Sequence, residues 1–143
     1  MHFYEAFDKF CAKCGLDVPS LMDGDNTILF DDQHAVTFQC DKADKSVILS
    51  SEICDAVGLG DNDLQMLLEA SLFGAQTGGA SFALSRQLSK VILWKRQDDS
   101  FIDEQALAQV INGFLATVIT WKQRLAGGNG ENTHVYAGKG LLA

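Results

Sequence analysis

Apolar side chains at the start of the chain recur with the spacing of one helical face. The positions i, i+4, i+7 and i+11 are held by Phe3, Phe7, Phe10 and Cys14. This spacing predicts an α-helix over residues 2–14. Gly15 is a suitable C-terminal stop, and Pro19, the only proline in the chain, prevents the helix from resuming.

Three short apolar segments, separated by polar residues, follow this helix. They cover residues 27–30, 35–40 and 46–50. In the second segment, Val36 and Phe38 alternate with smaller or polar neighbours, as expected for a strand with one buried face. Short strands joined by polar turns predict an antiparallel meander.

A second helical pattern begins after two glycines at positions 58 and 60. Asp61 can cap this helix. Its apolar stripe consists of Leu64, Leu67, Leu68 and Leu72. Gly74 and the Gly78–Gly79 pair predict where the helix ends.

Two further strands are predicted over residues 80–84 and 90–96, joined by a polar turn. The apolar residues of the second strand point alternately to its two faces: Val91 and Leu93 to one, Ile92 and Trp94 to the other. A strand that is apolar on both faces must be covered on both sides.

The longest helical pattern lies near the end of the chain, over residues 103–125. It repeats Leu107, Val110, Ile111, Phe114, Leu115, Val118, Trp121 and Leu125. Residues 127–143 are rich in glycine and poor in apolar side chains, so we expect a flexible tail. The chain has 143 residues, which suffices for one domain and not for two ordinary ones. We place that domain at residues 1–126.

Charge and composition exclude several classes of protein. The formal charge is -8 and the pI is near 4.6, which would repel a phosphate backbone, so no nucleic-acid partner is expected. The N-terminus lacks the basic flank and apolar run of a signal peptide, and no segment reaches the ~18 apolar residues of a membrane span. We therefore expect a cytoplasmic protein without membrane insertion.

The four cysteines do not form a metal or redox motif. Cys11 and Cys14 lie at the end of a predicted helix, whereas the nucleophile of a thioredoxin-like site lies at a helix N-terminus. Cys40 and Cys54 do not supply the second close pair of a structural zinc site. We expect all four to be reduced, buried or partly buried thiols, with no disulfide, metal or other cofactor.

The sequence also shows no catalytic constellation. His2, His34 and His134 fall in a terminus, a turn and a tail, and the nucleophile-elbow, Walker and Rossmann patterns are absent. The acidic run Asp23–Asn26 lacks the closing Glu of a calcium loop and is typical of a turn. We therefore expect no enzymatic activity.

Residues 67–96 carry the most informative pattern. A helix closes in a Leu-Leu-Glu-Ala run, a Thr-Gly-Gly turn follows, and a second strand carries apolar residues before a basic pair. This pattern resembles the type III secretion chaperones of the Tir-chaperone family. The matching residues are Leu67, Leu68, Glu69, Ala70, Leu72, Thr77, Gly78, Gly79, Phe82, Leu84, Val91, Leu93, Lys95 and Arg96. Ser71 departs mildly from the family, in which Asn is common at this position.

The resemblance implies an α+β fold in the order α-β-β-β-α-β-β-α, with three helices and a strongly twisted antiparallel sheet of about five strands. It also implies a homodimer. The second helix and the following strands offer more apolar surface than so small a domain can cover by itself. The predicted dimer interface consists of Leu64, Leu67, Leu68, Ile92 and Trp94.

The resemblance further implies a function without catalysis. Members of the family bind the N-terminal segment of a secreted effector in an extended form and keep it soluble and competent for export. The implied partners are a second copy of the chain, effector segments and the secretion ATPase. The predicted effector-binding residues are Phe3, Phe7, Phe10, Leu29, Val36, Phe38 and Ile48.

Several alternatives stay open at this point. The aromatic face of the first helix either packs only on the domain's own sheet or also lines an effector groove. A dimer of the same fold can instead sequester a partner that is never exported, and so couple secretion to gene expression. A small enzyme without a recognisable motif is a weaker third interpretation. The tail around residues 134–136 is either dispensable or a separate docking motif.

Overall fold

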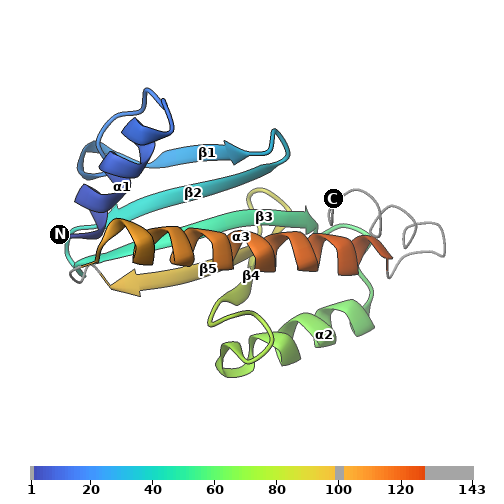
Figure 1. The fold of residues 1–143 in the computed structure, drawn as a ribbon. Helices are drawn as coiled ribbons and strands as arrows, with labels where there is room; N and C mark the ends of the chain where they lie inside the picture. Colours follow the sequence, from blue (N-terminus) through green and yellow to red (C-terminus); the bar gives the residue numbers. More distant parts are fainter. Residues whose placement is uncertain (1, 99–101, 128–143) are drawn as a thin grey trace.

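The computed structural model describes residues 2–98 and 102–127 (Figure 1). The helices are α1 (Phe3–Lys13), α2 (Asp61–Ser71) and α3 (Glu104–Gly127), with two short 3-10 helices, η1 (Leu21–Asp23) and η2 (Leu72–Gly74). The strands are β1 (Asn26–Phe30), β2 (His34–Asp41), β3 (Ser46–Asp55), β4 (Ser81–Ser85) and β5 (Lys90–Asp98). The element order and the five-stranded antiparallel sheet confirm the predicted fold class.

The strands lie in the order β1-β2-β3-β5-β4, and each is antiparallel to its neighbours. β1, β2 and β3 form the predicted meander, and β4 and β5 form a hairpin whose second strand returns beside β3. The register of β3 with β5 runs from Ser46 opposite Asp98 to Asp55 opposite Lys90. Both strands extend beyond their predicted ranges because each supplies the other with main-chain partners past its apolar run.

One face of the sheet carries most of the core. Its side chains are almost fully buried: Val36, Phe38, Val47, Leu49, Val91 and Leu93. α1 packs there through Phe7, whose ring centroid lies 4.6 Å from that of Phe38. α3 packs there through Trp121, whose ring centroid lies 5.0 Å from that of Phe82. α2 covers the same face beside β4, so all three helices lie on one side of the sheet.

No helix of the described residues covers the opposite face, which we call the open face (Figure 1). The strand register places Thr27, Thr37, Ser50 and Trp94 in one row across β1, β2, β3 and β5 on this face. All four are half-buried or exposed. A sheet buried on one side only leaves its other side accessible to another molecule.

The glycine-marked turn after α2 holds that helix against the rest of the domain. The hydroxyl of Ser71, the last residue of α2, accepts a hydrogen bond from the Phe82 N–H of β4 at 2.9 Å. Thr77 is buried, and its hydroxyl donates to a backbone carbonyl three residues further on. The indole N–H of Trp121 donates to the carbonyl of Gln76 at 3.3 Å. The turn therefore ties α2, β4 and α3 together.

Two local expectations are corrected by the structure. Asp61 is the first residue of α2 and not its cap; Gly60 precedes the helix, and its N–H donates to the Asp63 carboxylate at 3.2 Å. Cys14 is exposed, because α1 ends one residue earlier and Cys14 leaves the packed face, whereas Cys11 is buried as expected. The predicted flexible tail lies outside the described residues, apart from Gly127 at the end of α3.

Replacing Gly74 by Ala is expected to destabilise the domain. Gly74 has φ +66°, and an added Cβ would lie 2.5 Å from the Cα of Gly79. Both the left-handed backbone and the clash oppose a side chain, so we expect the free energy of unfolding to fall by about 3 kcal/mol. Urea denaturation of the purified variant measures this loss.

Gly24→Ala is the matched control for this experiment. Gly24 has an extended backbone, and nothing lies within 4 Å of an added Cβ. The control should change the free energy of unfolding by no more than about 0.5 kcal/mol. Similar losses in both variants would contradict the role given to the turn.

Candidate functional site

The predicted effector-binding residues fall into two groups. The first group is fully buried between α1 and the sheet: Phe3, Phe7, Val36 and Phe38. In the second group, Phe10 and Ile48 are half-buried and Leu29 is 55% exposed. Leu29 and Ile48 lie on the open face, whereas Phe10 lies on α1. The buried side chains form the core of the single chain, and a partner can reach only the second group directly.

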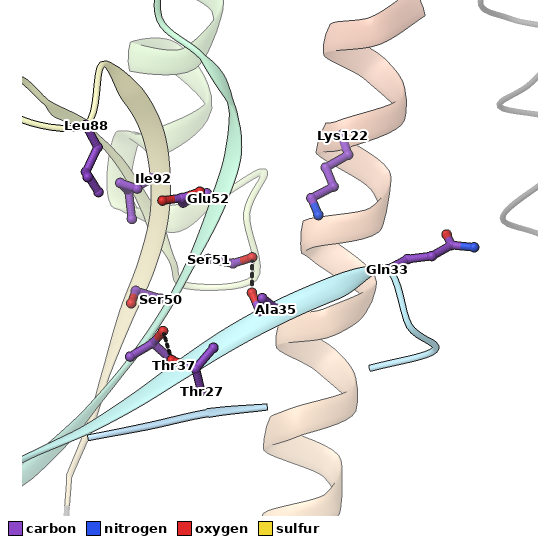
Figure 2. Close-up of a pocket in the computed structure, with 10 residues that line it drawn as sticks. All are labelled: Thr27, Gln33, Ala35, Thr37, Ser50, Ser51, Glu52, Leu88, Ile92 and Lys122. Carbon is purple, nitrogen blue, oxygen red and sulfur yellow. Dashed lines mark hydrogen bonds between the residues drawn. The ribbon is translucent and has the colours of Figure 1, made fainter. Parts of the chain in front are cut away.

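The open face is hollowed where β2 and β3 separate (Figure 2). The two strands are paired as far as Thr37 and Ser50. Beyond this point the Ser51 hydroxyl donates to the Ala35 carbonyl at 2.8 Å. The hollow, which we call the sheet trough, has a volume of about 550 Å³. It is lined by Thr27, Gln33, Ala35, Thr37, Ser50, Ser51, Glu52, Leu88, Ile92 and Lys122.

The lining of the sheet trough suits side chains of another polypeptide. Figure 2 shows small or hydroxyl-bearing side chains along β2 and β3, with Glu52, Ile92 and Leu88 on one side and Lys122 of α3 on the other. The hydroxyls of Thr27 and Thr37 are 2.8 Å apart and hydrogen-bonded to each other. Small side chains at the centre of a concave surface leave room for larger side chains of a bound segment.

Lys122 also reaches the buried His34 at the start of β2, with 3.2 Å between Nζ and Nδ1. Burial lowers the pKa of His34 from its usual 6.5, the nearby Lys122 lowers this pKa further, and Asp31 opposes both effects. Burial lowers the pKa of Lys122 as well, and Glu52 opposes that change. A neutral His34 can accept a hydrogen bond from the Lys122 ammonium group, so this contact holds α3 against the β1–β2 hairpin near neutral pH.

The two outer strands of the sheet differ in the state of their outer edges. At β4, the Ser71 hydroxyl accepts the N–H of Phe82, and directly before the strand Thr77 binds both the N–H and the carbonyl of Ala80. At β1, no other strand of the described residues pairs with the outer side. An unpaired edge accepts an additional strand through main-chain hydrogen bonds, so β1 is the edge open to such addition.

A second accessible apolar surface lies where α2 meets β4. A pocket of about 250 Å³ is lined there by Leu64, Leu67, Leu68, Phe82, Ala83, Leu84 and Val91. Leu68 is 73% exposed and Leu84 is 59% exposed. Leu72 and Phe73 continue the exposed apolar side chains beyond the end of α2. We call the pocket and these two residues the α2–β4 surface. Clustered exposed apolar groups of this kind mark interaction sites.

The residues predicted for the dimer interface lie on two faces. Those on α2 belong to the α2–β4 surface, although Leu67 is buried. Ile92 and Trp94 are half-buried on the open face, which none of the described helices covers. The residues of α2 and the two residues of β5 both lie next to β4, because Ile92 pairs with Ala83 and Trp94 pairs with Ser81.

Sequence reasoning did not include Leu84 or Phe73 among the interface residues. Phe73 is 95% exposed and has φ +55°, a left-handed conformation that is unusual for a bulky residue. Helical spacing does not identify Phe73 as an interface residue, because the predicted apolar stripe of the helix ends at Leu72. The one feature of the sequence that points to Phe73 is that it directly follows this stripe.

The cysteines, the acidic groups and the helices add no further site. Burial raises the pKa of the Cys11 thiol to about 11, with a contribution from Asp8, so this thiol is neutral and unreactive. Within residues 2–98 and 102–127, no three side chains of the metal-binding types gather closely enough to hold an ion. None of the described helices is long and apolar enough to cross a membrane.

Comparison with protein families identifies the family of this chain. The sequence profile of the Tir chaperone protein (CesT) family matches residues 6–122. The chain belongs to this family. The matched residues run from α1 into α3 and include the sheet trough, the β1 edge and the α2–β4 surface. Members of the Tir chaperone family act by binding other proteins and not by catalysis. Comparison with curated proteins finds no match.

Solved structures show the same fold at low sequence identity. A chain in the ExsC–ExsE complex aligns with a TM-score of 0.72 and 18% identity, over 84% of this chain and 90% of that chain. A chain in the HopA1–SchA chaperone–effector complex aligns with a TM-score of 0.69 and 19% identity, over 85% and 94%. A chain in the heterodimeric ExoU–SpcU complex from the type III secretion system of Pseudomonas aeruginosa gives 0.63 and 18%, over 82% and 93%.

Acidification is expected to destabilise the domain through His34. The pKa of His34 is lower in the folded protein than its usual 6.5. The unfolded chain therefore binds more protons, and stability is lost as the pH falls below that value. His34→Gln keeps an acceptor for Lys122 and removes the titrating group. Its urea midpoint should fall less than that of the wild type between about pH 7.5 and about pH 5.5.

His2→Gln serves as the control for this measurement, because His2 is exposed. Its pH dependence should follow that of the wild type. If His34→Gln also keeps the full pH dependence of the wild type, another group is responsible for the loss of stability.

Proposed function

We propose that this protein is a type III secretion chaperone that binds the N-terminal segment of one or more secreted effectors in an extended form. The observation that carries the proposal is the family match over residues 6–122, in a domain whose described residues leave one face of the sheet without a helix and the outer side of β1 without a partner strand. Binding keeps the effector soluble and competent for export. It takes place in the bacterial cytoplasm, before delivery to the secretion ATPase.

The two features of the sheet suggest how an extended segment is held. A strand of the segment pairs with β1 through main-chain hydrogen bonds, which demand little of its sequence. Alternate side chains of that strand then lie beside Leu29 and the sheet trough, with Ile48 further along the open face. Ordering a flexible segment costs entropy, so a second contact region is needed to offset that cost. Phe10 on α1 provides accessible apolar surface for it.

We further propose that two copies pair through the α2–β4 surface. A contact about a two-fold axis would bury Leu68, Leu72, Phe73 and Leu84 of both copies. Ile92 and Trp94 would then lie at its border, on the other side of β4. This arrangement leaves β1 outside the interface, because β1 and β4 are opposite edges of the sheet.

The effector-binding proposal is tested by capture from the native bacterium under conditions that induce secretion. We expect the wild-type protein to retain a secreted protein through its N-terminal segment, as identified by mass spectrometry. Leu29→Asp places a charge beside the β1 edge and should reduce the recovered amount at least tenfold, because burying a charge in an apolar contact is costly.

Val57→Asp is the matched control, since Val57 is 81% exposed and lies in the loop between β3 and α2. It should recover the same protein in the same amount as the wild type. Recovery of only a protein that stays in the cell would favour the sequestration alternative instead. Equal recovery with Leu29→Asp and the wild type would exclude the β1 edge as the binding site.

The dimer proposal is tested by sedimentation equilibrium. Leu68→Asp places a charge in the centre of the α2–β4 surface, and we expect it to raise the dimer dissociation constant by at least ~30-fold. Leu29→Asp is a control with the same chemical change at the opposite edge of the sheet, and it should leave the dimer intact. A dimer that survives Leu68→Asp would place the interface elsewhere.

A further inference from the structure

Carboxylates surround the region where the proposed segment would bind. Glu52 lines the sheet trough. Asp25 precedes β1 and accepts a hydrogen bond from the Gln39 amide at 3.2 Å. Asp31 and Asp32 follow β1 directly, and both are exposed. Among the described residues, none of these four carboxylates lies within ion-pair distance of a lysine or arginine. Glu52 acts on Lys122 and Lys90 at longer range, but in the described part of the chain none of the four carboxylates is held in an ion pair that a partner would have to break.

The cations nearest to this region are largely engaged elsewhere. Arg96 forms ion pairs with Asp41 and Asp44 and a hydrogen bond with Ser46 at 2.6 Å. Lys90 is paired with Asp55. Lys122 lines the trough from the α3 side and directs its ammonium group to His34. Among the described residues that line the trough or directly flank β1, four are acidic and Lys122 is the one lysine or arginine, so the field of this set of residues is negative.

Three of these carboxylates lie at the two ends of β1. The strand has five residues, so it spans about 16 Å at about 3.3 Å per residue. Asp25 lies at one end of this span and Asp31 and Asp32 lie at the other, whereas the exposed Leu29 lies between them. A strand paired with β1 therefore meets negative charge at both ends and apolar surface in the middle.

We infer that the segment bound at the β1 edge and the sheet trough is a basic one: a strand of alternating apolar side chains with a lysine or arginine near each end. The inference rests on the proposed function and names the chemistry of its partner. Basic side chains at the two ends would meet the aspartates, and a basic side chain crossing the trough would meet Glu52. An acidic segment would instead add like charge to a surface that already carries an excess of it.

The test is a selection of random peptides of about twelve residues, displayed on phage, against the immobilised full-length chain. We expect lysine and arginine to be enriched several-fold over the starting library, on both sides of an apolar stretch. A synthetic peptide taken from the enriched pool should bind more weakly as salt is raised, because exposed charges are screened. Its affinity should fall about fivefold with Glu52→Lys, the size of effect expected for an exposed ion pair.

Asp17→Lys is the matched control, since Asp17 is exposed between α1 and η1 and the change in net charge is the same. Asp31→Asn combined with Asp32→Asn provides a second test that keeps the turn residues small. Circular dichroism and urea midpoints check that each variant folds. The affinity should be unchanged in the control and reduced in both test variants.

Three results would overturn the inference: enrichment of neutral or acidic peptides, no enrichment at all, or equal loss of affinity in Asp17→Lys and Glu52→Lys. Failure of the proposed function would look different. One outcome is that capture yields a secreted protein whose recovery is lost in Leu29→Asp but whose bound segment is neutral or acidic. In that case the chaperone proposal stands, and the inference of a basic segment is wrong. If capture yields no secreted protein while basic peptides are selected, the chemistry of the surface stands without that function.

Discussion

The one-sided burial of the sheet is the constraint on which the rest of the structure depends. α1, α2 and α3 all pack on the face that carries Phe38, Val91 and Leu93, and the long α3 crosses it with Trp121 packed edge-on against Phe82. The apolar core formed there keeps the strands in register. The opposite face is thereby held in a concave shape that no helix of residues 2–98 and 102–127 covers. A rigid surface of this kind binds an extended chain at a lower entropy cost than a mobile one, because only the partner must be ordered.

The turn between α2 and β4 makes the two edges of that sheet different. Ser71 accepts the Phe82 N–H of β4, and Thr77 binds Ala80 directly before the strand, so the start of this edge already has partners within the chain. The same turn ends α2 so that Leu68 remains exposed and Phe73 projects into solvent. A short sequence signature therefore has two structural consequences: it occupies the start of one edge, and it presents apolar side chains there for a different kind of contact. The β1 edge has no such contacts from a neighbouring strand of the described residues.

The sequence predicted the elements well because their signals are local. Alternation at Val36 and Phe38 identified the buried face of β2, and helical spacing from Leu107 to Leu125 identified α3. The division between core and surface was harder to predict. Periodicity puts Phe3 and Phe7 on one face of a helix, but it does not say whether the domain's own sheet or a partner covers that face. The sheet trough was not predictable at all, because it arises where β2 and β3 separate and brings together side chains from β1, β2, β3, β5 and α3.

The opposite positions of β1 and β4 have a consequence for a dimer joined at the α2–β4 surface. The order β1-β2-β3-β5-β4 places each β1 edge as far from the proposed interface as the sheet allows. Two equivalent edges, each with its trough and its negative rim, would then be presented at the outer ends of the dimer. One long segment that engages both would gain from the high effective concentration of the second site once the first is occupied. Two weak contacts, each with little dependence on the sequence of the segment, can in this way give a high overall affinity. Once one end of the segment dissociates, this gain is lost and the other end dissociates more easily.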